Sequence, residues 1–182
     1  IPKIQARDLH IQRQWNDLVV GTFGRGVYIL DDYSALRHVN EERLSGPAWL
    51  FPLRPAPVFA ELNQMRPVWG DQTTANPPFG AVLTYHISET GSAQQDFVIM
   101  ITDANGDHVR TLDLPNASGL QRITWNLRRA VAELPAGTRG GRGRQGTLVG
   151  TGSYTATIGL GEGVTFIGYG EPQTILVVPL QR

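Results

Sequence analysis

Apolar and polar residues alternate along much of this chain, and a period of two is typical of β-strands with one buried face. In the segment 81–88 the alternation places Ala81, Leu83, Tyr85 and Ile87 on one side. Similar apolar segments recur at intervals of about ten residues, at 96–103, 108–114, 120–127, 152–160, 164–170 and 173–180. Seven strands in roughly a hundred residues predict an antiparallel β-sandwich of immunoglobulin or fibronectin III kind over residues 80–182.

The first part of the chain contains an apolar hairpin with a glycine-rich turn, residues 16–32. Leu18 and Val20 precede the turn, Val27 and Ile29 follow it, and a further alternating segment around Leu9 comes before. A two-stranded ribbon by itself is barely stable in water. We therefore expect the hairpin to join a larger sheet or to pack on the chain that follows.

A different pattern separates these two regions. Residues 33–44 have helical spacing of apolar positions, with Ser34 as the expected N-cap of one short helix. The segment 46–62 then contains Pro47, Pro52, Pro55 and Pro57, a density that excludes a central strand. We expect an extended connector with at most short edge pairing near 49–51 and 58–60. The predicted organisation is thus 1–33 hairpin, 34–79 helix and connector, and 80–182 sandwich.

The order of several segments resembles a known family. The segments are "DLVVGTFGRGVYILDD", "LFPLRPAPVF", "NPPFGAVLTYHI", "ITDANGDHVRTLDL", "ITWNLR" and "GSYTATIGL". Together they are similar to the C-terminal region of bacterial exported sortilin-like, BNR-repeat β-propeller proteins, often labelled glycosyl hydrolases. The resemblance implies that residues 1–33 are the closing strands of a propeller blade and that the sandwich is fibronectin III-like or flagellar hook-cap-like. That family usually has histidine where this chain has Phe23, so the resemblance assigns no polar role to that position.

Composition narrows the possible chemistry. The chain has 16 basic and 16 acidic residues, so its net charge does not favour binding to nucleic acid. It has no cysteine, which excludes disulfides and thiolate metal sites. No apolar run approaches the length of about 18 residues that a membrane-spanning helix needs. His10, His38, His86 and His108 lack the spacing of metal ligands, and His10, His86 and His108 fall on outward positions of the predicted strands. We therefore expect no metal and no cofactor.

Paired carboxylates are the groups that a glycosidase requires. The candidates are Asp31 with Asp32, Glu41 with Glu42, and Asp103 with Asp107. Adjacent acids on a strand point to opposite faces, and Glu41 and Glu42 belong to an expected solvated helix surface. The segment 103–107 reads as a hairpin turn around Asn105-Gly106 rather than as a calcium loop. We therefore assign no catalytic residue.

Two further motifs have a structural and a functional interpretation. Arg139, Arg142 and Arg144 lie among glycines, as in segments that bind RNA, but without interleaved aromatic residues they favour a surface loop. Trp15, Trp49 and Trp69 have the composition of a sugar-stacking platform, yet their irregular spacing favours packing of the connector. Trp125 is expected to anchor the sandwich core in place of a disulfide.

The sequence therefore predicts a non-catalytic structural or interaction module of a larger exported β-propeller protein. Its expected partners are upstream propeller blades of the same polypeptide or another protein chain. Part of a glycoside hydrolase or carbohydrate-binding protein is one alternative. A subunit that self-assembles through exposed strand edges is the other. The resemblance implies a periplasmic, cell-surface or extracellular location.

Overall fold

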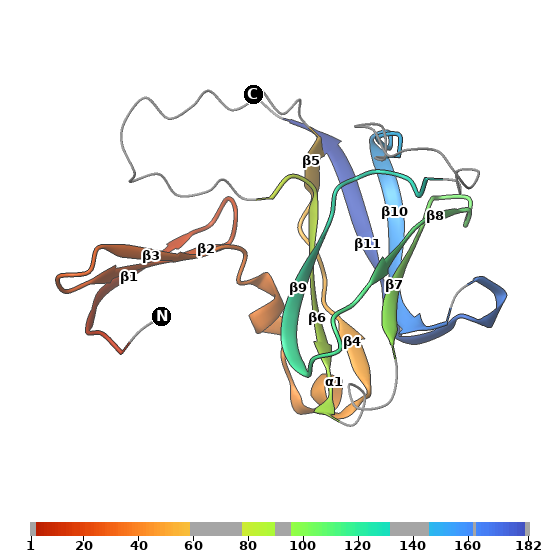
Figure 1. The fold of residues 1–182 in the computed structure, drawn as a ribbon. Coiled ribbons are helices and arrows are strands. Elements are labelled where there is room, and N and C mark those ends of the chain that lie inside the picture. The colour runs from red at the N-terminus through yellow and green to blue at the C-terminus, as the bar shows by residue number, and fades with distance from the viewer. Residues whose placement is uncertain (1–2, 59–77, 90–95, 132–145, 162, 181–182) are drawn as a thin grey trace, which may run out of the picture. The chain divides into compact units, whose positions relative to one another are not determined.

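The computed structural model describes residues 3–58, 78–89, 96–131, 146–161 and 163–180. The chain forms two compact units, Ile1–Val39 and Asn40–Arg182. Both are built mainly from β-strands (Figure 1), so the predicted all-β class is confirmed.

The first unit is a three-stranded antiparallel meander. Its strands are β1 (Ala6–Gln12), β2 (Asp17–Thr22) and β3 (Val27–Leu30), with β2 in the centre. The β2–β3 turn uses Gly24 and Gly26, whose φ angles of 76° and 74° lie in the left-handed region. The predicted hairpin is thus present, and β1 adds a third strand to it.

Two short helices replace the single helix expected over 33–44. A 3₁₀ helix, η1, spans Ser34–His38, and α1 spans Glu41–Ser45. Between them Val39 and Asn40 have extended backbone, and the Asn40 side chain accepts a hydrogen bond from the Arg43 backbone N–H at 2.8 Å. Asn40 is therefore the residue that caps the α-helix, and Ser34 makes no side-chain cap for η1.

Among the described residues of the range 34–79 there are two strands, and both belong to sheets of the second unit. β4 (Ala48–Leu50) pairs antiparallel with β6 (Ala81–Ile87), and β5 (Ala56–Val58) pairs parallel with β11 (Ile167–Pro179). The described strand pairs within residues 80–182 are all antiparallel, as predicted for that range, and the parallel pair is made by β5, a strand of the predicted connector. Both strands are three residues long and lie at sheet edges, where a residue such as Pro57 is tolerated.

The described strands of the second unit form two sheets. One has the order β4-β6-β9 and the other β5-β11-β10-β7-β8. The remaining strands are β7 (Phe97–Thr102), β8 (His108–Asp113), β9 (Gly119–Trp125) and β10 (Gly152–Leu160). A short 3₁₀ helix, η2 (Gly163–Thr165), precedes β11. β11 is one continuous strand, whereas the sequence pattern predicted two separate strands at 164–170 and 173–180.

Both sheets contribute to one buried core. The alternating face of β6 is buried as predicted, with Ala81, Leu83, Tyr85 and Ile87 each at most 2% exposed. β10 and β11 add Ile158 and Ile175, both 0% exposed, from the other sheet. Burial of apolar area on this scale is the main stabilising term of such a unit.

Trp125 lies in this core, as expected. Its side chain is 0% exposed, and its indole N–H donates to the Arg128 carbonyl at 3.0 Å. The ring meets Tyr154 edge to face with centroids 5.4 Å apart. The largest apolar side chain of β9 is thus buried without an unsatisfied donor.

Candidate functional site

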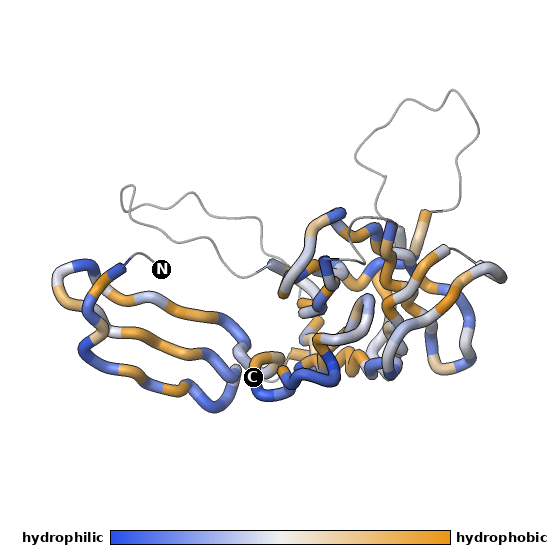
Figure 2. Tube along the Cα trace, turned by 90° about the horizontal axis from the view of Figure 1, so that it is seen from below, coloured by the Kyte–Doolittle hydropathy of each residue, from blue (hydrophilic) through white to orange (hydrophobic). Residues whose placement is uncertain are grey.

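The first unit carries apolar side chains on both faces of its sheet. Residues that are paired across neighbouring strands share a face. On one face these are Leu9, Ile11, Leu18, Val20, Tyr28 and Leu30; on the other they include Val19, Val27 and Ile29. Figure 2 shows the apolar stretches along all three strands. β3 is therefore apolar on both sides.

Much of this apolar surface is exposed. Leu9, Val27 and Ile29 are 62%, 63% and 60% exposed, and Val20 is the one buried residue among the three strands. The alternation along β1 and β2 predicted a buried face, but on that face Val20 alone is buried among the described residues, and Leu9, Ile11 and Leu30 are exposed. Exposed apolar residues gathered on one small sheet are typical of a surface that another protein segment covers.

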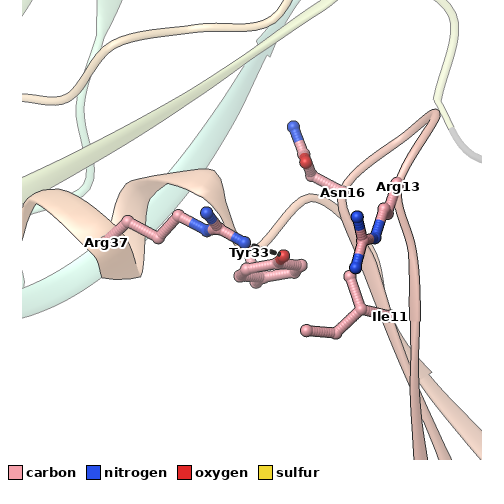
Figure 3. A pocket seen from close by; sticks show the side chains of 5 residues that line it. All are labelled: Ile11, Arg13, Asn16, Tyr33 and Arg37. Atoms are coloured by element: carbon pink, nitrogen blue, oxygen red, sulfur yellow. Dashed lines mark hydrogen bonds between the residues drawn. The ribbon is translucent and has the colours of Figure 1, made fainter.

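A hollow of about 400 Å³ lies in the same unit (Figure 3). It is lined by Ile11 at the end of β1, Arg13 and Asn16 in the β1–β2 turn, and Tyr33 and Arg37 after β3. The Arg37 guanidinium donates a hydrogen bond to the Tyr33 hydroxyl and lies over the Tyr33 ring, 4.9 Å from its centroid. The lining combines one apolar wall with two cations and two neutral polar groups.

Two hydrogen bonds donated by backbone N–H groups hold the two sides of this hollow together. The Tyr33 backbone N–H donates to the Asn16 carbonyl at 2.8 Å, and the Asp32 N–H donates to Asp17 Oδ1 at 3.0 Å. Asn16 and Asp32 have left-handed φ angles of 56° and 44°, a conformation that asparagine and aspartate tolerate better than most residues. The hollow is thus formed by the fold itself.

The carboxylates predicted as weak catalytic candidates have structural surroundings. Asp32 is buried, and its Oδ1 accepts from the Ser34 backbone N–H at 3.2 Å, whereas Asp31 is exposed. Glu41 and Glu42 are exposed in the first turn of α1, where a carboxylate interacts favourably with the positive end of the helix dipole. Neither pair gathers around a common hollow in the described part of the chain.

Asp103 organises the β7–β8 turn. Its Oδ1 accepts from the backbone N–H groups of Asn105 and Asp107 at 3.0 and 3.1 Å, and its Oδ2 is 3.4 Å from Arg129. Desolvation acts to raise the pKa of Asp103, but these hydrogen bonds and the Arg129 charge outweigh it and lower the pKa below its ordinary value. The predicted hairpin turn at Asn105-Gly106 is confirmed, with Gly106 at φ 85°.

The histidines are dispersed. His10 and His108 are exposed on β1 and β8, as the alternation predicted. His86 instead is half-buried on β6, paired across the strands with Trp49 of β4. Burial lowers the pKa of His86, and its Nδ1 has no hydrogen-bond partner among the described residues. No group of three or more metal-ligating side chains occurs within the described ranges.

The two remaining sequence motifs lie partly or wholly outside the described residues. Trp69 and the segment 139–144 fall there, so neither the sugar platform nor the arginine loop is tested. Trp49 is half-buried with the Arg43 guanidinium over its ring at 5.5 Å, and Trp15 is 39% exposed. Trp49 thus packs within its unit, in line with the structural interpretation.

Sequence reasoning missed the residues of the hollow. Arg13 and Arg37 belong to a turn and a short helix, and no motif or spacing joins them. The two segments meet only in the folded structure, because the backbone hydrogen bond between Tyr33 and Asn16 brings them together.

No described helix is both long and apolar enough to cross a membrane. Comparison of the chain with protein-family models, with curated proteins and with solved structures gives no match.

Proposed function

We propose that this chain is a non-catalytic interaction module of a larger exported, bacterial β-propeller protein. In this proposal residues 1–33 are strands of a propeller blade, and the second unit is an immunoglobulin- or fibronectin III-like sandwich that supports the propeller or docks it to a surface. The sequence resemblance to sortilin-like, BNR-repeat proteins motivates the first part.

The strand order of the second unit supports an immunoglobulin-like sandwich. In that fold the first, second and fifth strands (A, B and E) form one sheet, and the third, sixth and seventh (C, F and G) lie side by side in the other. Here β4, β6 and β9 are neighbours in one sheet, and β7, β10 and β11 are neighbours in the other. β8 then extends the second sheet at its β7 edge, and β5 at its β11 edge.

A second observation favours the same fold. In immunoglobulin domains a tyrosine near the start of the sixth strand donates its hydroxyl to a backbone carbonyl a few residues upstream. Tyr154 is the third residue of β10, and its hydroxyl donates to the Gly150 carbonyl at 3.0 Å. Two residues later, where antibody domains have a cysteine, Ala156 is 0% exposed.

The observation that carries the proposed function is the two-sided apolar character of β3. A strand that faces water on one side needs apolar residues on the other side alone, whereas Val27, Tyr28, Ile29 and Leu30 are apolar throughout. Such a strand suits a sheet that is covered on both faces. Blades of a propeller are small sheets arranged radially around a channel, so each face of a blade meets a neighbour. We infer that other blades cover both faces, except at the end of β1 where Ile11 lines the hollow.

A pair of isoleucine substitutions tests this function. Ile29→Lys places a charge on β3, and Ile167→Lys places one at an isoleucine of β11 that is 63% exposed, against 60% for Ile29. Introduced into the native polypeptide, Ile29→Lys is expected to lower the Tm by about 5 °C or more, because it buries a charge. Ile167→Lys is expected to change the Tm of the native polypeptide little. In the 182-residue chain alone, both substitutions are expected to have small effects on the Tm. Equal, small effects in the native polypeptide would reject the proposal.

Self-assembly is the second candidate, because exposed apolar faces of this kind can also pack against those of another copy. Sedimentation of the 182-residue chain separates the two functions. A concentration-dependent dimer or fibre that Ile29→Lys abolishes favours self-assembly, whereas a monomer at all concentrations favours the propeller module.

A further inference from the structure

Two guanidinium groups line the hollow of the first unit, and neither has a carboxylate partner among the residues that the structure describes. Arg13 forms no ion pair within the part of the chain that the structure describes. The interactions of Arg37 are both with Tyr33, a neutral residue: a hydrogen bond to the hydroxyl and a contact with the ring face. No carboxylate of the described ranges therefore forms an ion pair with either guanidinium.

Nearby carboxylates are engaged by backbone groups. Asp17 Oδ1 accepts from the Asp32 N–H, and Asp32 Oδ1 accepts from the Ser34 N–H. A cation–π contact positions Arg37 while leaving its charge available, since the ring contributes no net negative charge. This arrangement differs from an arginine that is fixed by a salt bridge.

The other residues that line the hollow offer hydrogen-bonding groups and an apolar surface. The Tyr33 hydroxyl accepts from Arg37 and keeps its own proton to donate, and the Asn16 amide offers both a donor and an acceptor. Ile11 supplies an apolar wall. A volume of about 400 Å³ lies within the usual range of small-molecule sites.

We propose that this hollow binds a small hydroxylated molecule that carries an oxyanion, a carboxylate or a phosphate, on a body the size of one sugar ring. Arg13 and Arg37 pair with the oxyanion, because guanidinium groups match both anions through two parallel N–H donors. Asn16 and Tyr33 hydrogen-bond to hydroxyl groups, and Ile11 contacts the C–H face of the ring. The backbone hydrogen bond between Tyr33 and Asn16 keeps the site preformed, which lowers the entropic cost of binding.

The test is an NMR titration of the 182-residue chain with glucuronate, glucose 6-phosphate, glucose and inorganic phosphate. Each is added up to about 10 mM, a range that covers a Kd near 1 mM. We expect saturable shifts of the amides of Arg13, Asn16, Tyr33 and Arg37 with at least one of the two sugar anions. Glucuronate alone identifies a carboxylate site, glucose 6-phosphate alone a phosphate site, and both together a site for either oxyanion.

Three matched variants assign the binding to the hollow. Arg13→Gln and Arg37→Gln are each expected to weaken binding about tenfold or more. Arg25→Gln removes the same charge from the β2–β3 turn, outside the hollow, and is expected to leave the Kd unchanged within about twofold.

Three results would overturn the proposal. The first is the absence of saturable shifts with both sugar anions. The second is binding of inorganic phosphate as strong as that of the sugar anions, because it would deny a role to the sugar body. The third is equal weakening by Arg25→Gln, because it would show general charge attraction rather than a site.

Discussion

The rings of Trp125 and Tyr154 meet edge to face, 5.4 Å apart, and so join the two sheets of the second unit. Trp125 closes β9, and Tyr154 begins the buried part of β10. Each ring also has a partner for its polar atom, the Arg128 and Gly150 carbonyls. The pair therefore combines apolar burial with two satisfied hydrogen bonds.

Removing the Tyr154 hydroxyl tests the second of these bonds. Tyr154→Phe is expected to lower the free energy of unfolding by about 1 kcal/mol, because the Gly150 carbonyl loses its donor. Tyr169→Phe is the control, since Tyr169 packs against Phe97 at 5.8 Å and its hydroxyl has no hydrogen bond within the described residues. It is expected to change stability by less than about 0.5 kcal/mol. Urea unfolding measures both, and equal losses would contradict the assignment.

Gly80 is required by close backbone packing before β6. It has φ +126°, and an added Cβ would lie 2.1 Å from the Trp125 carbonyl oxygen. Gly80→Ala is therefore expected to cost about 3 kcal/mol or more, through both strain and a clash with backbone. Gly46 has no atom within 4 Å of the corresponding Cβ position, so Gly46→Ala is expected to be nearly neutral. A tolerated alanine at residue 80, measured by thermal unfolding, would refute this packing.

The β7–β8 turn is expected to weaken in acid. The pKa of Asp103 is lower when folded than when unfolded, so its carboxylate stabilises the fold above the ordinary pKa and loses that effect as the pH falls through the folded value. Asp103→Asn should lower stability at neutral pH and progressively less in acid. Asp107→Asn, which leaves the Asp103 acceptor intact, should not show this pattern. Unfolding free energies across the acidic range measure the difference.

His86 is expected to add a second, milder pH dependence. Burial lowers its pKa below the ordinary 6.5, so the unfolded chain binds the proton more strongly. Stability contributed by neutral His86 is present above pH 6.5 and is lost as the pH falls below that value. His86→Gln should reduce the slope of stability between neutral and mildly acidic pH. His10→Gln, at an exposed position of β1, should leave the slope unchanged.

Alternating burial of side chains along the strands made much of the second unit predictable from its sequence. The alternation from Ala81 to Ile87 identified the strand and its buried face, and Asn105-Gly106 identified the β7–β8 turn. The break between η1 and α1 was not visible, because it depends on the Asn40 side chain capping a later turn. The parallel pairing of β5 with β11 joins segments more than a hundred residues apart, which no local pattern reports.

The candidate site was the least predictable part. Arg13 and Arg37 have ordinary surroundings in the sequence, and a left-handed Asn16 with its Tyr33 hydrogen bond creates the hollow. The exposure of the first sheet was also not predicted, since alternation indicates which face is apolar but not whether anything covers it.

Both faces of the β1–β3 sheet are proposed to be covered by other protein segments. Amide hydrogen exchange of β2 and β3 tests this proposal, when the 182-residue chain is compared with the native polypeptide purified from its source. Exchange in the native protein is expected to be slower by about tenfold or more, because covered strands open less often. The same rate in both samples would show that the sheet remains uncovered and would contradict the proposal.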